Sequence, residues 1–398
     1  MKLKKILGVL LCSAAVPSLL NAAPVYAEET ENTNEIIEQL ISDYAFAEDP
    51  STGQILLDKD STEIIYPASM TKMMTVLLGI ENLSNLNERV QITYQMLSGL
   101  AEANASVMGL YAGDLPTVED LLYGAALPSG ADACNAIAFQ VSGGINAFVD
   151  LMNEKAAEIG MKNTHFVNPT GLHDDNHYTT CRDMALLMEY GLQNETFRTI
   201  FSAESYTTSS LASSVNGITC YSTSKSAIRN QGYDIPGFTG AKTGFTYEAG
   251  HCMTSWSELN GMELIVVTAH GDTGYYDYSH LDDAETILQY FSGWERKELF
   301  TSGQLASTIT VNTYKGTETI EVCTFEDLTL DIPSDKEIVL TTTFPEEVDA
   351  ELDERFISGS IILKAGDEVL YSSDIAVKIP KETSLLGRLK LYFAGLFG

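Results

Sequence analysis

The pattern of apolar residues changes after about residue 300, and this change constrains the fold more than any other feature of the chain. Beyond it, short runs of alternating apolar and polar residues recur roughly every ten residues, as is typical of a small all-β domain. The runs lie at 308–311, 319–322, 328–332, 338–341, 360–363 and 375–379. The sequence therefore predicts an all-β sandwich domain over 299–380, preceded by a larger domain over 28–298.

The larger region mixes strand and helix patterns. Two apolar runs between 44 and 57 flank a Pro- and Gly-containing turn and predict a β-hairpin. Ser69 to Glu81 has apolar residues at helical spacing, and Thr117 with Asp120 resembles a capping box that starts another helix. Strand-like sequence returns between 242 and 270. Further helices are predicted at 132–140, 148–159 and 182–192. These elements predict an α/β (α+β) domain.

The first 27 residues have the features of a secretory signal peptide. Three lysines among the first five residues precede an apolar stretch over 6–20, and Val25-Tyr26-Ala27 matches a signal-peptidase site. We therefore expect an exported chain whose mature form begins at Glu28. Five cysteines follow, and their odd number and irregular spacing do not indicate a disulfide framework.

Acidic residues dominate the charge of the chain. It has 55 Asp and Glu against 23 Lys and Arg, a formal net charge of −32. Loss of the signal peptide removes three lysines and no acids, which brings the net charge to about −35. So few cations cannot form an extended basic face, and this excludes nucleic acid as a partner.

The last segment, 381–398, has one continuous apolar face. A series from Leu385 to Phe397 follows helical spacing, and Arg388 and Lys390 are its only charges. The series is too short to cross a bilayer, which needs about 20 apolar residues. An amphipathic helix lying in a membrane interface fits the pattern better. Docking of the same face on the β domain is the alternative.

Three short motifs carry the chemistry. In the first, Ser69 and Lys72 are three residues apart and share a helix face, so the lysine can act as a base if its amine is neutral. Burial beside another cation would lower the pKa of that amine as required. The second motif is Ser129-Gly130-Ala131 at a helix break, and the third is Lys242-Thr243-Gly244. Each motif is weak alone, but this ordered set is typical of penicillin-binding proteins and class A β-lactamases.

Residues 44–291 resemble the low-molecular-weight penicillin-binding proteins, which are serine-type D-alanyl-D-alanine carboxypeptidases. The resemblance rests on PASMTK at 67–72, TVEDLL at 117–122, LPSG at 127–130, FVNPTGL at 166–172, YTTCRDMA at 178–185 and GAKTG at 240–244. The β domain and the C-terminal helix are also similar to that family. The resemblance implies a transpeptidase/β-lactamase-like catalytic domain with an antiparallel sheet and a helical region.

The resemblance also implies a role for each motif residue. Ser69 would be the nucleophile and Lys72 its base, while Ser129 would relay a proton to the leaving amine. Lys242 and Thr243 would hold the substrate carboxylate.

The remaining expectations concern the backbone and the partners. The N–H groups of Ser69 and Phe245 would bind the oxyanion, and Gly244 would let the substrate backbone approach. Peptidoglycan stem peptides are the expected substrates, with β-lactams as inhibitors that acylate Ser69. The enzyme is expected on the outer face of the cytoplasmic membrane, attached through the C-terminal helix. No cofactor and no metal are expected, and His173 to His177 are interpreted as part of a family loop.

Two residues depart from the family pattern. Ala131 stands where the family usually has Asn, and Asn135, one turn further on, is not expected to replace it. His280 stands where the family typically offers an Arg to the terminal carboxylate, and a neutral imidazole is a weaker partner for that group. Both departures predict altered affinity or specificity while the chemistry is retained. They also leave a non-catalytic wall-binding protein as an alternative, and a β-lactamase is the other.

Overall fold

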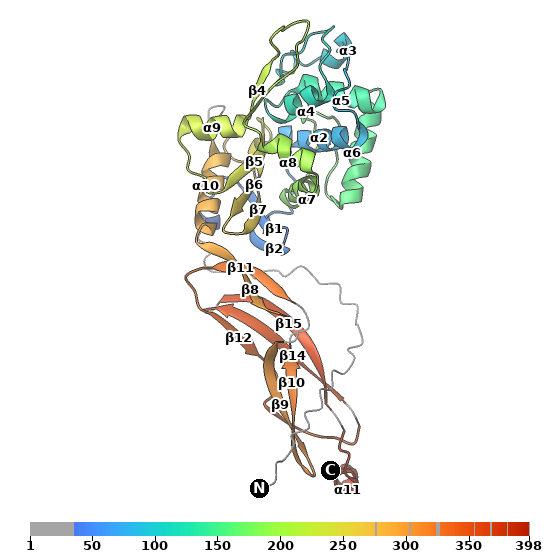
Figure 1. Cartoon of the computed structure of the whole chain (residues 1–398), viewed down its shortest axis with the longest axis vertical. Coiled ribbons are helices and arrows are strands. Elements are labelled where there is room, and N and C mark those ends of the chain that lie inside the picture. Colours follow the sequence, from blue (N-terminus) through green and yellow to red (C-terminus); the bar gives the residue numbers. More distant parts are fainter. Residues whose placement is uncertain are drawn as a thin grey trace, which may run out of the picture.

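The computed structural model describes residues 36–274, 277–301, 304–323, 327–353, 355–366, 368–379 and 381–397. The expected signal peptide over 1–27 lies outside these residues. The described chain is elongated, with a mixed helix-and-sheet part at one end and a β-rich part at the other (Figure 1).

A five-stranded antiparallel sheet with the strand order β2-β1-β7-β6-β5 forms the centre of the mixed part. Its strands are β1 (Tyr44–Asp49), β2 (Gln54–Lys59), β5 (Phe238–Thr246), β6 (Gly250–Leu259) and β7 (Met262–Ala269). β1 and β2 form the hairpin that the sequence predicts. β5 lies at one edge of the sheet and carries the third motif, so this motif has one open side.

Both faces of the sheet are covered, and the central strand β7 shows this in its sequence. Leu264 and Val266 belong to the core that includes α10 (Ser279–Phe291), whereas Ile265 and Val267 belong to the larger core of the other helices. Burial on both faces explains why residues 264–267 of this strand form a continuous apolar run. Burying one such side chain contributes about 1.5–3 kcal/mol.

The helices on the opposite face from α10 include those predicted from the sequence. Thr117 caps α4 in the predicted way: its Oγ1 accepts from Asp120 N at 3.1 Å, and its N–H donates to Asp120 Oδ2 at 2.8 Å. A polar helix near 223–231 has no predicted counterpart, because Ser224 is its only fully buried residue. The elements on this face are η1 (Ala68–Thr71), α2 (Lys72–Asn82), α3 (Tyr94–Leu97), α4 (Val118–Ala126), α5 (Ala131–Ser142), α6 (Ile145–Ile159), α7 (Cys181–Leu192), α8 (Glu195–Ser202) and a hairpin of β3 (Ser205–Thr207) and β4 (Thr219–Tyr221). The polar helix is α9 (Thr223–Gln231), and its Ala227 and Ile228 pack against the core that includes α10.

The C-terminal part is built from strands only, apart from its last helix, among the residues that are described. Its strands form three small sheets with the orders β11-β8, β10-β9-β13 and β12-β14-β15. They are β8 (Trp294–Phe300), β9 (Leu305–Thr313), β10 (Gly316–Cys323), β11 (Leu328–Pro333), β12 (Ile338–Thr342), β13 (Glu347–Asp349), β14 (Arg355–Ala365) and β15 (Glu368–Ile379). β8 crosses the expected boundary at 298–299 and pairs with β11. Its charged residues hide the strand pattern in the sequence.

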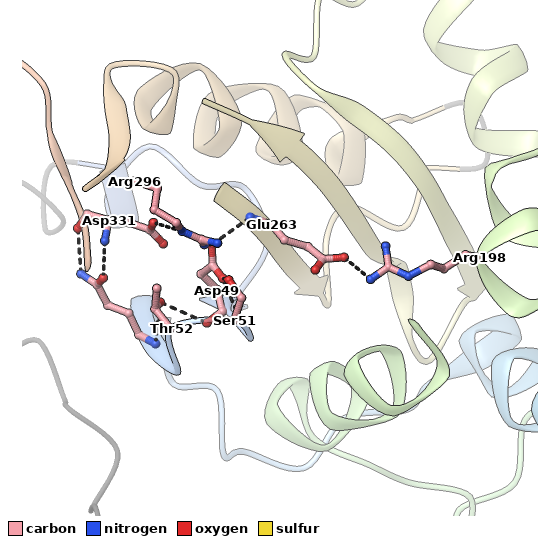
Figure 2. A network of polar contacts seen from close by, with 8 residues as sticks. Asp49, Ser51, Thr52, Arg198, Glu263, Arg296 and Asp331 are labelled. Carbon is pink, nitrogen blue, oxygen red and sulfur yellow. Dashed lines mark hydrogen bonds and ion pairs between the residues drawn. The ribbon is translucent and has the colours of Figure 1, made fainter. Parts of the chain in front are cut away.

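A buried polar network joins the two parts (Figure 2). Arg296 of β8 contacts the carboxylate of Asp49 at the end of β1, and its Nε donates to Asp331 Oδ1 of β11 at 3.1 Å. Both carboxylate side chains are fully buried. The Gln54 side chain bonds both backbone groups of Asp331, at 3.1 and 2.9 Å. A pocket of about 380 Å³ beside this network includes Arg198 and Arg296 but none of the residues of the three motifs.

The chain ends in α11 (Leu385–Phe397), as the spacing of its apolar residues predicts. Leu385, Leu386 and Leu389 are exposed by 76%, 60% and 44%. The carboxylate of Glu382 fixes the start of this segment, because it accepts from Tyr314 N in the β9–β10 turn at 2.6 Å and from Ser384 N at 2.7 Å. None of the helices that the structure describes is long and apolar enough to cross a membrane.

Candidate active site

Ser69 and Lys72 lie where the short helix η1 runs into α2. Lys72 Nζ is 2.6 Å from Ser69 Oγ and donates to the backbone oxygen of Thr170, also at 2.6 Å. Thr170 O can only accept, so it takes one N–H of the amine. When Lys72 is neutral, its lone pair is then available to the Ser69 hydroxyl proton. The first motif therefore forms the side-chain contact between Ser69 and Lys72 that its spacing predicts.

The environment of the Lys72 amine makes its deprotonation easier. The side chain is buried, and this burial lowers the pKa of Lys72 to about 8, although the nearby Cys134 and Asp132 act in the opposite direction. When the pKa of an amine base is near the working pH, a substantial fraction of the amine is neutral and can accept a proton. The same amine is still basic enough to drive the proton transfer.

The segment 166–172 supports Lys72, a role that the sequence did not reveal. Asn168 Oδ1 accepts from Thr170 N, Thr170 Oγ1 and Gly171 N, at 3.0, 2.9 and 2.7 Å. Thr75 of α2 donates to Pro169 O at 2.7 Å. These bonds place the carbonyl of Thr170 over the amine. The Asn-Pro-Thr-Gly sequence signals a turn, but nothing local indicates that the turn faces a lysine.

The backbone before Ser69 is tightly packed against the same segment. Ala68 adopts a positive φ of 44°. Gly171 also has a positive φ, of 76°, and a Cβ on it would lie 1.8 Å from Ala68 O. Only glycine fits there, and its contact holds the strained backbone before Ser69 in place.

Ser129 lies at the break between α4 and α5, as predicted. It has a positive φ of 61°, its side chain is buried, and its Oγ has no hydrogen-bond partner within the described part of the chain. Buried hydroxyl groups normally have a hydrogen-bond partner. The unpaired Ser129 Oγ therefore suits a group that forms its hydrogen bond with a bound ligand. Asp132 stabilises the surrounding loop by accepting from Met108 N, Gly109 N and Leu110 N at 2.9–3.0 Å.

Ala131 is buried next to Ser129, at the position where the family pattern has an asparagine. Asn135 Nδ2 donates to Met96 O at 2.8 Å. Its amide is therefore engaged away from the motif, as the one-turn offset predicts.

Strand β5 brings the third motif to the first. Lys242 is buried. Burial is the main cause that lowers the pKa of Lys242 to about 7, and the positive charge of the nearby Lys72 is the second cause. Its Nζ donates to Thr243 O at 2.9 Å, and Thr243 Oγ1 lies 3.1 Å from Thr223 Oγ1. A Cβ on Gly244 would lie 2.9 Å from Pro67 O, so glycine lets this strand pack directly against the segment before Ser69.

Phe245 and His280 lie on the other side of β5. The Phe245 ring packs on His251, with centroids 4.5 Å apart, and His251 stacks on His280 at 5.0 Å. Burial is the main cause that lowers the pKa of His280 to about 3, and the nearby His251 is the second cause. The His280 ring is therefore neutral. His280 therefore offers no cation, and its Nδ1 is buried without a partner in the described structure.

The other histidine candidates make contacts within the protein. Val167 N donates to His177 Nδ1 at 3.0 Å, so the neutral ring carries its proton on Nε2 and donates it to Thr71 Oγ1 at 2.7 Å. Burial lowers the pKa of His177 to about 4, consistent with a neutral ring. His177 thus ties the loop to the residue between Ser69 and Lys72, while His173 lies 3.4 Å from Asp175.

The model of the family described as D-alanyl-D-alanine carboxypeptidase matches residues 29–273. The chain belongs to this D-alanyl-D-alanine carboxypeptidase family. The chain is 30% identical over 384 residues to the D-alanyl-D-alanine carboxypeptidase DacF of Bacillus subtilis, and the match covers 94% of each protein.

Solved structures agree with this assignment. The chain is similar to penicillin binding protein 5 of Haemophilus influenzae at 25% identity and a TM-score of 0.63, over 86% of this chain and 98% of that one. It shares its fold with the D-alanyl-D-alanine carboxypeptidase DacD of Francisella tularensis at 23% identity and a TM-score of 0.68, over 86% and 94% of the two chains. These structural matches confirm the fold class, and the family model together with DacF confirms the family that the motifs indicate.

Membership of the D-alanyl-D-alanine carboxypeptidase family identifies the chain as a serine hydrolase of peptidoglycan metabolism that acts outside the cytoplasm. The expectation of a D-alanyl-D-alanine carboxypeptidase is thereby confirmed.

Proposed function

We propose that this carboxypeptidase releases the terminal D-alanine of peptidoglycan stem pentapeptides through an acyl-enzyme on Ser69, and that β-lactams acylate the same oxygen. One observation carries the assignment of the nucleophile: Ser69 Oγ lies 2.6 Å from the amine of a buried lysine. A serine hydroxyl needs such a base to become nucleophilic at neutral pH.

In the acylation step, Ser69 Oγ attacks the carbonyl carbon between the last two D-alanines while Lys72 takes the hydroxyl proton. The carbonyl oxygen becomes an oxyanion, which the backbone N–H groups of Ser69 and Phe245 stabilise. The C–N bond then breaks, and Ser129 relays a proton to the departing amine. The unpartnered Oγ of Ser129 supports this role.

In the deacylation step, water attacks the ester carbonyl and Ser69 regains its proton. Lys72 serves again as the base, because it is the amine in contact with Ser69 Oγ. The products are the shortened peptide and free enzyme.

Lys242 and Thr243 hold the terminal carboxylate in this proposal, and Gly244 allows the peptide backbone to lie along the open edge of β5. His280 lies behind this end of the site, in the ring stack on the α10 side of the sheet, and as a neutral imidazole it supplies no charge for the carboxylate. Lys242 is then the main cation for the carboxylate.

The test is release of D-alanine from a diacetyl-Lys-D-Ala-D-Ala peptide by the purified mature chain, compared with a Ser69→Ala variant. The matched control is Ser98→Ala, which makes the same chemical change at an exposed residue after α3. We expect release by the wild type and by the control only. Equal background release by wild type and Ser69→Ala would instead support a non-catalytic wall-binding protein.

A fluorescent penicillin tests how long the proposed acyl-enzyme on Ser69 persists. A stable, Ser69-dependent label supports the carboxypeptidase mechanism, because the acyl-enzyme then persists. Rapid turnover of the penicillin would mean that the site works as a β-lactamase.

We further propose that α11 attaches the enzyme to the outer face of the cytoplasmic membrane and that the β domain holds the catalytic domain above it. Leu385, Leu386 and Leu389 supply an exposed apolar face, with Arg388 and Lys390 for anionic headgroups. Such a helix lies in the interface and does not cross the bilayer.

Membrane attachment is tested by sedimentation of the mature chain with vesicles that contain phosphatidylglycerol. A Leu385→Asp/Leu389→Asp variant should stay in solution, whereas the control Leu305→Asp, which makes the same chemical change at an exposed position of the β domain, should still bind. Binding of the double variant at the wild-type level would rule out α11 as the anchor.

A further inference from the structure

Three aromatic rings form a column behind the third motif. His251 on β6 is the register partner of Phe245 on β5, and their ring centroids lie 4.5 Å apart. The other side of His251 stacks on His280 of α10, with centroids 5.0 Å apart and ring planes 12° from parallel. His251 therefore links two strands and a helix.

The column lies on the face of the sheet opposite to Ser69. Ala241 of β5 and Met253 of β6 belong to the core that includes α10. Alternation along a strand places Phe245 and His251, at even spacing from them, on that same face. Gly244 faces the opposite way, toward Pro67 and Ala68. The rings thus support the back of the strand end whose front packs against the nucleophile segment.

His251 also makes a contact that a plain aromatic ring cannot make. Its Nε2 lies 2.9 Å from Gly274 O, and because a carbonyl only accepts, this nitrogen donates. Gly271 N donates to the backbone oxygen of His251 at 3.0 Å. These bonds connect the ring and its strand to the segment that leads into α10.

We propose that His251 is a positioning residue of the carboxypeptidase reaction, which keeps Phe245 at the end of β5 in register with Ser69. This inference rests on the proposed function, in which Phe245 N–H binds the oxyanion. Without His251, Phe245 loses the nearer of two rings against which it packs, since the Tyr247 ring lies 5.7 Å away, and α10 loses its stacked link to the sheet. The end of β5 then moves relative to Ser69, and a small misplacement of reacting groups has a large effect on rate.

The test compares His251→Ala, which loses the ring and the hydrogen bond, with His251→Phe, which keeps the ring. His270→Ala is the matched control, because His270 is an exposed histidine just after β7 in the same sheet. We measure kcat and KM for D-alanine release, the rate of Ser69 acylation by a fluorescent penicillin, and the midpoint of thermal unfolding.

We expect His251→Ala to lower kcat and the acylation rate by about tenfold or more while KM changes much less, because the loss falls on the oxyanion side. His251→Phe should recover part of this loss, and His270→Ala should match the wild type. A folded His251→Ala enzyme with the kcat of the control overturns the inference. If His251→Ala does not fold, the test uses His251→Phe and His251→Leu, the second of which has no ring. A wild-type kcat in both of these variants overturns the inference as well.

The same measurements separate the two proposals. A wild type that neither releases D-alanine nor becomes labelled contradicts the proposed function itself. An active wild type with unaffected His251 variants contradicts only the role of His251.

Discussion

Lys72 places its amine 2.6 Å from the hydroxyl of Ser69, inside a site where burial lowers the pKa of the amine to about 8. The second buried lysine, Lys242, has a pKa lowered to about 7 by burial and by Lys72. The proposed mechanism needs opposite protonation states in the two residues, since Lys72 must be neutral and Lys242 charged.

This requirement predicts a bell-shaped pH dependence of kcat/KM. The neutral fraction of Lys72 rises as the pH increases through about 8, while the charged fraction of Lys242 falls above about 7. Activity should therefore be greatest between about pH 7 and 8, with both limbs belonging to the pair of lysines. D-Alanine release measured across the pH range checks this. A plateau that extends to strongly alkaline pH would show that substrate binding does not need the Lys242 proton.

Substitution of Gly171 should damage both the stability and the nucleophile. Gly171→Ala places a Cβ 1.8 Å from Ala68 O at a positive φ, whereas Gly143→Ala has a similar φ of 78° and nothing within 4 Å. The backbone conformation alone costs about 1–2 kcal/mol in both variants, and the clash adds to this only in Gly171→Ala. Chemical denaturation should show the larger loss there, together with slower penicillin acylation. Equal losses in the two variants would mean that the Gly171–Ala68 contact is unimportant.

Restoring an amide at position 131 should improve substrate binding. Ala131→Asn adds a hydrogen-bonding group beside Ser129, and one such bond contributes about 1 kcal/mol, or roughly a fivefold decrease in KM. The control is Ala131→Leu, which adds similar volume without polar atoms. If steady-state kinetics of Ala131→Asn equal those of the wild type, the departure at this position has no functional meaning.

The network between the two parts of the molecule should be important for stability. Arg296→Met leaves the buried carboxylates of Asp49 and Asp331 without their cation, a change that costs about 3–5 kcal/mol for a buried pair. The control is Lys297→Met, which makes a similar change at the exposed neighbouring residue. Thermal unfolding measures the difference, and equal unfolding midpoints for the two variants would contradict the prediction.

Asp331 should also make stability depend on pH. Burial is the main cause that raises its pKa from 3.8 to about 7. The folded state then binds more protons than the unfolded state between these values, so this stability is present at low pH and is lost as the pH rises toward about 7. Asp331→Asn, which carries no titrating proton, should flatten that decline in denaturation midpoints measured from about pH 4 to 7. An unchanged slope would show that Asp331 titrates normally.

Much of the local structure could be predicted from the sequence because its causes are local. The turn-forming residues at 49–53 predict the β1–β2 hairpin, and the side chains of Thr117 and Asp120 predict the start of α4. The i, i+3 spacing predicts the contact between Ser69 and Lys72. Each of these features depends on residues a few positions apart, whose relative positions follow from the geometry of one turn of backbone.

The rest was decided by tertiary structure, because it depends on residues that are distant in sequence and meet only after folding. Thr170 O reaches the Lys72 amine from a segment 98 residues away, and burial by many elements sets the pKa of that amine. Arg296 and Asp49 are 247 residues apart. The sequence by itself determined the three motifs and the family to which they belong. Only the packed sheet and helices placed His251 between Phe245 and His280, since ring stacking across strands and a helix leaves no periodic signal in the chain.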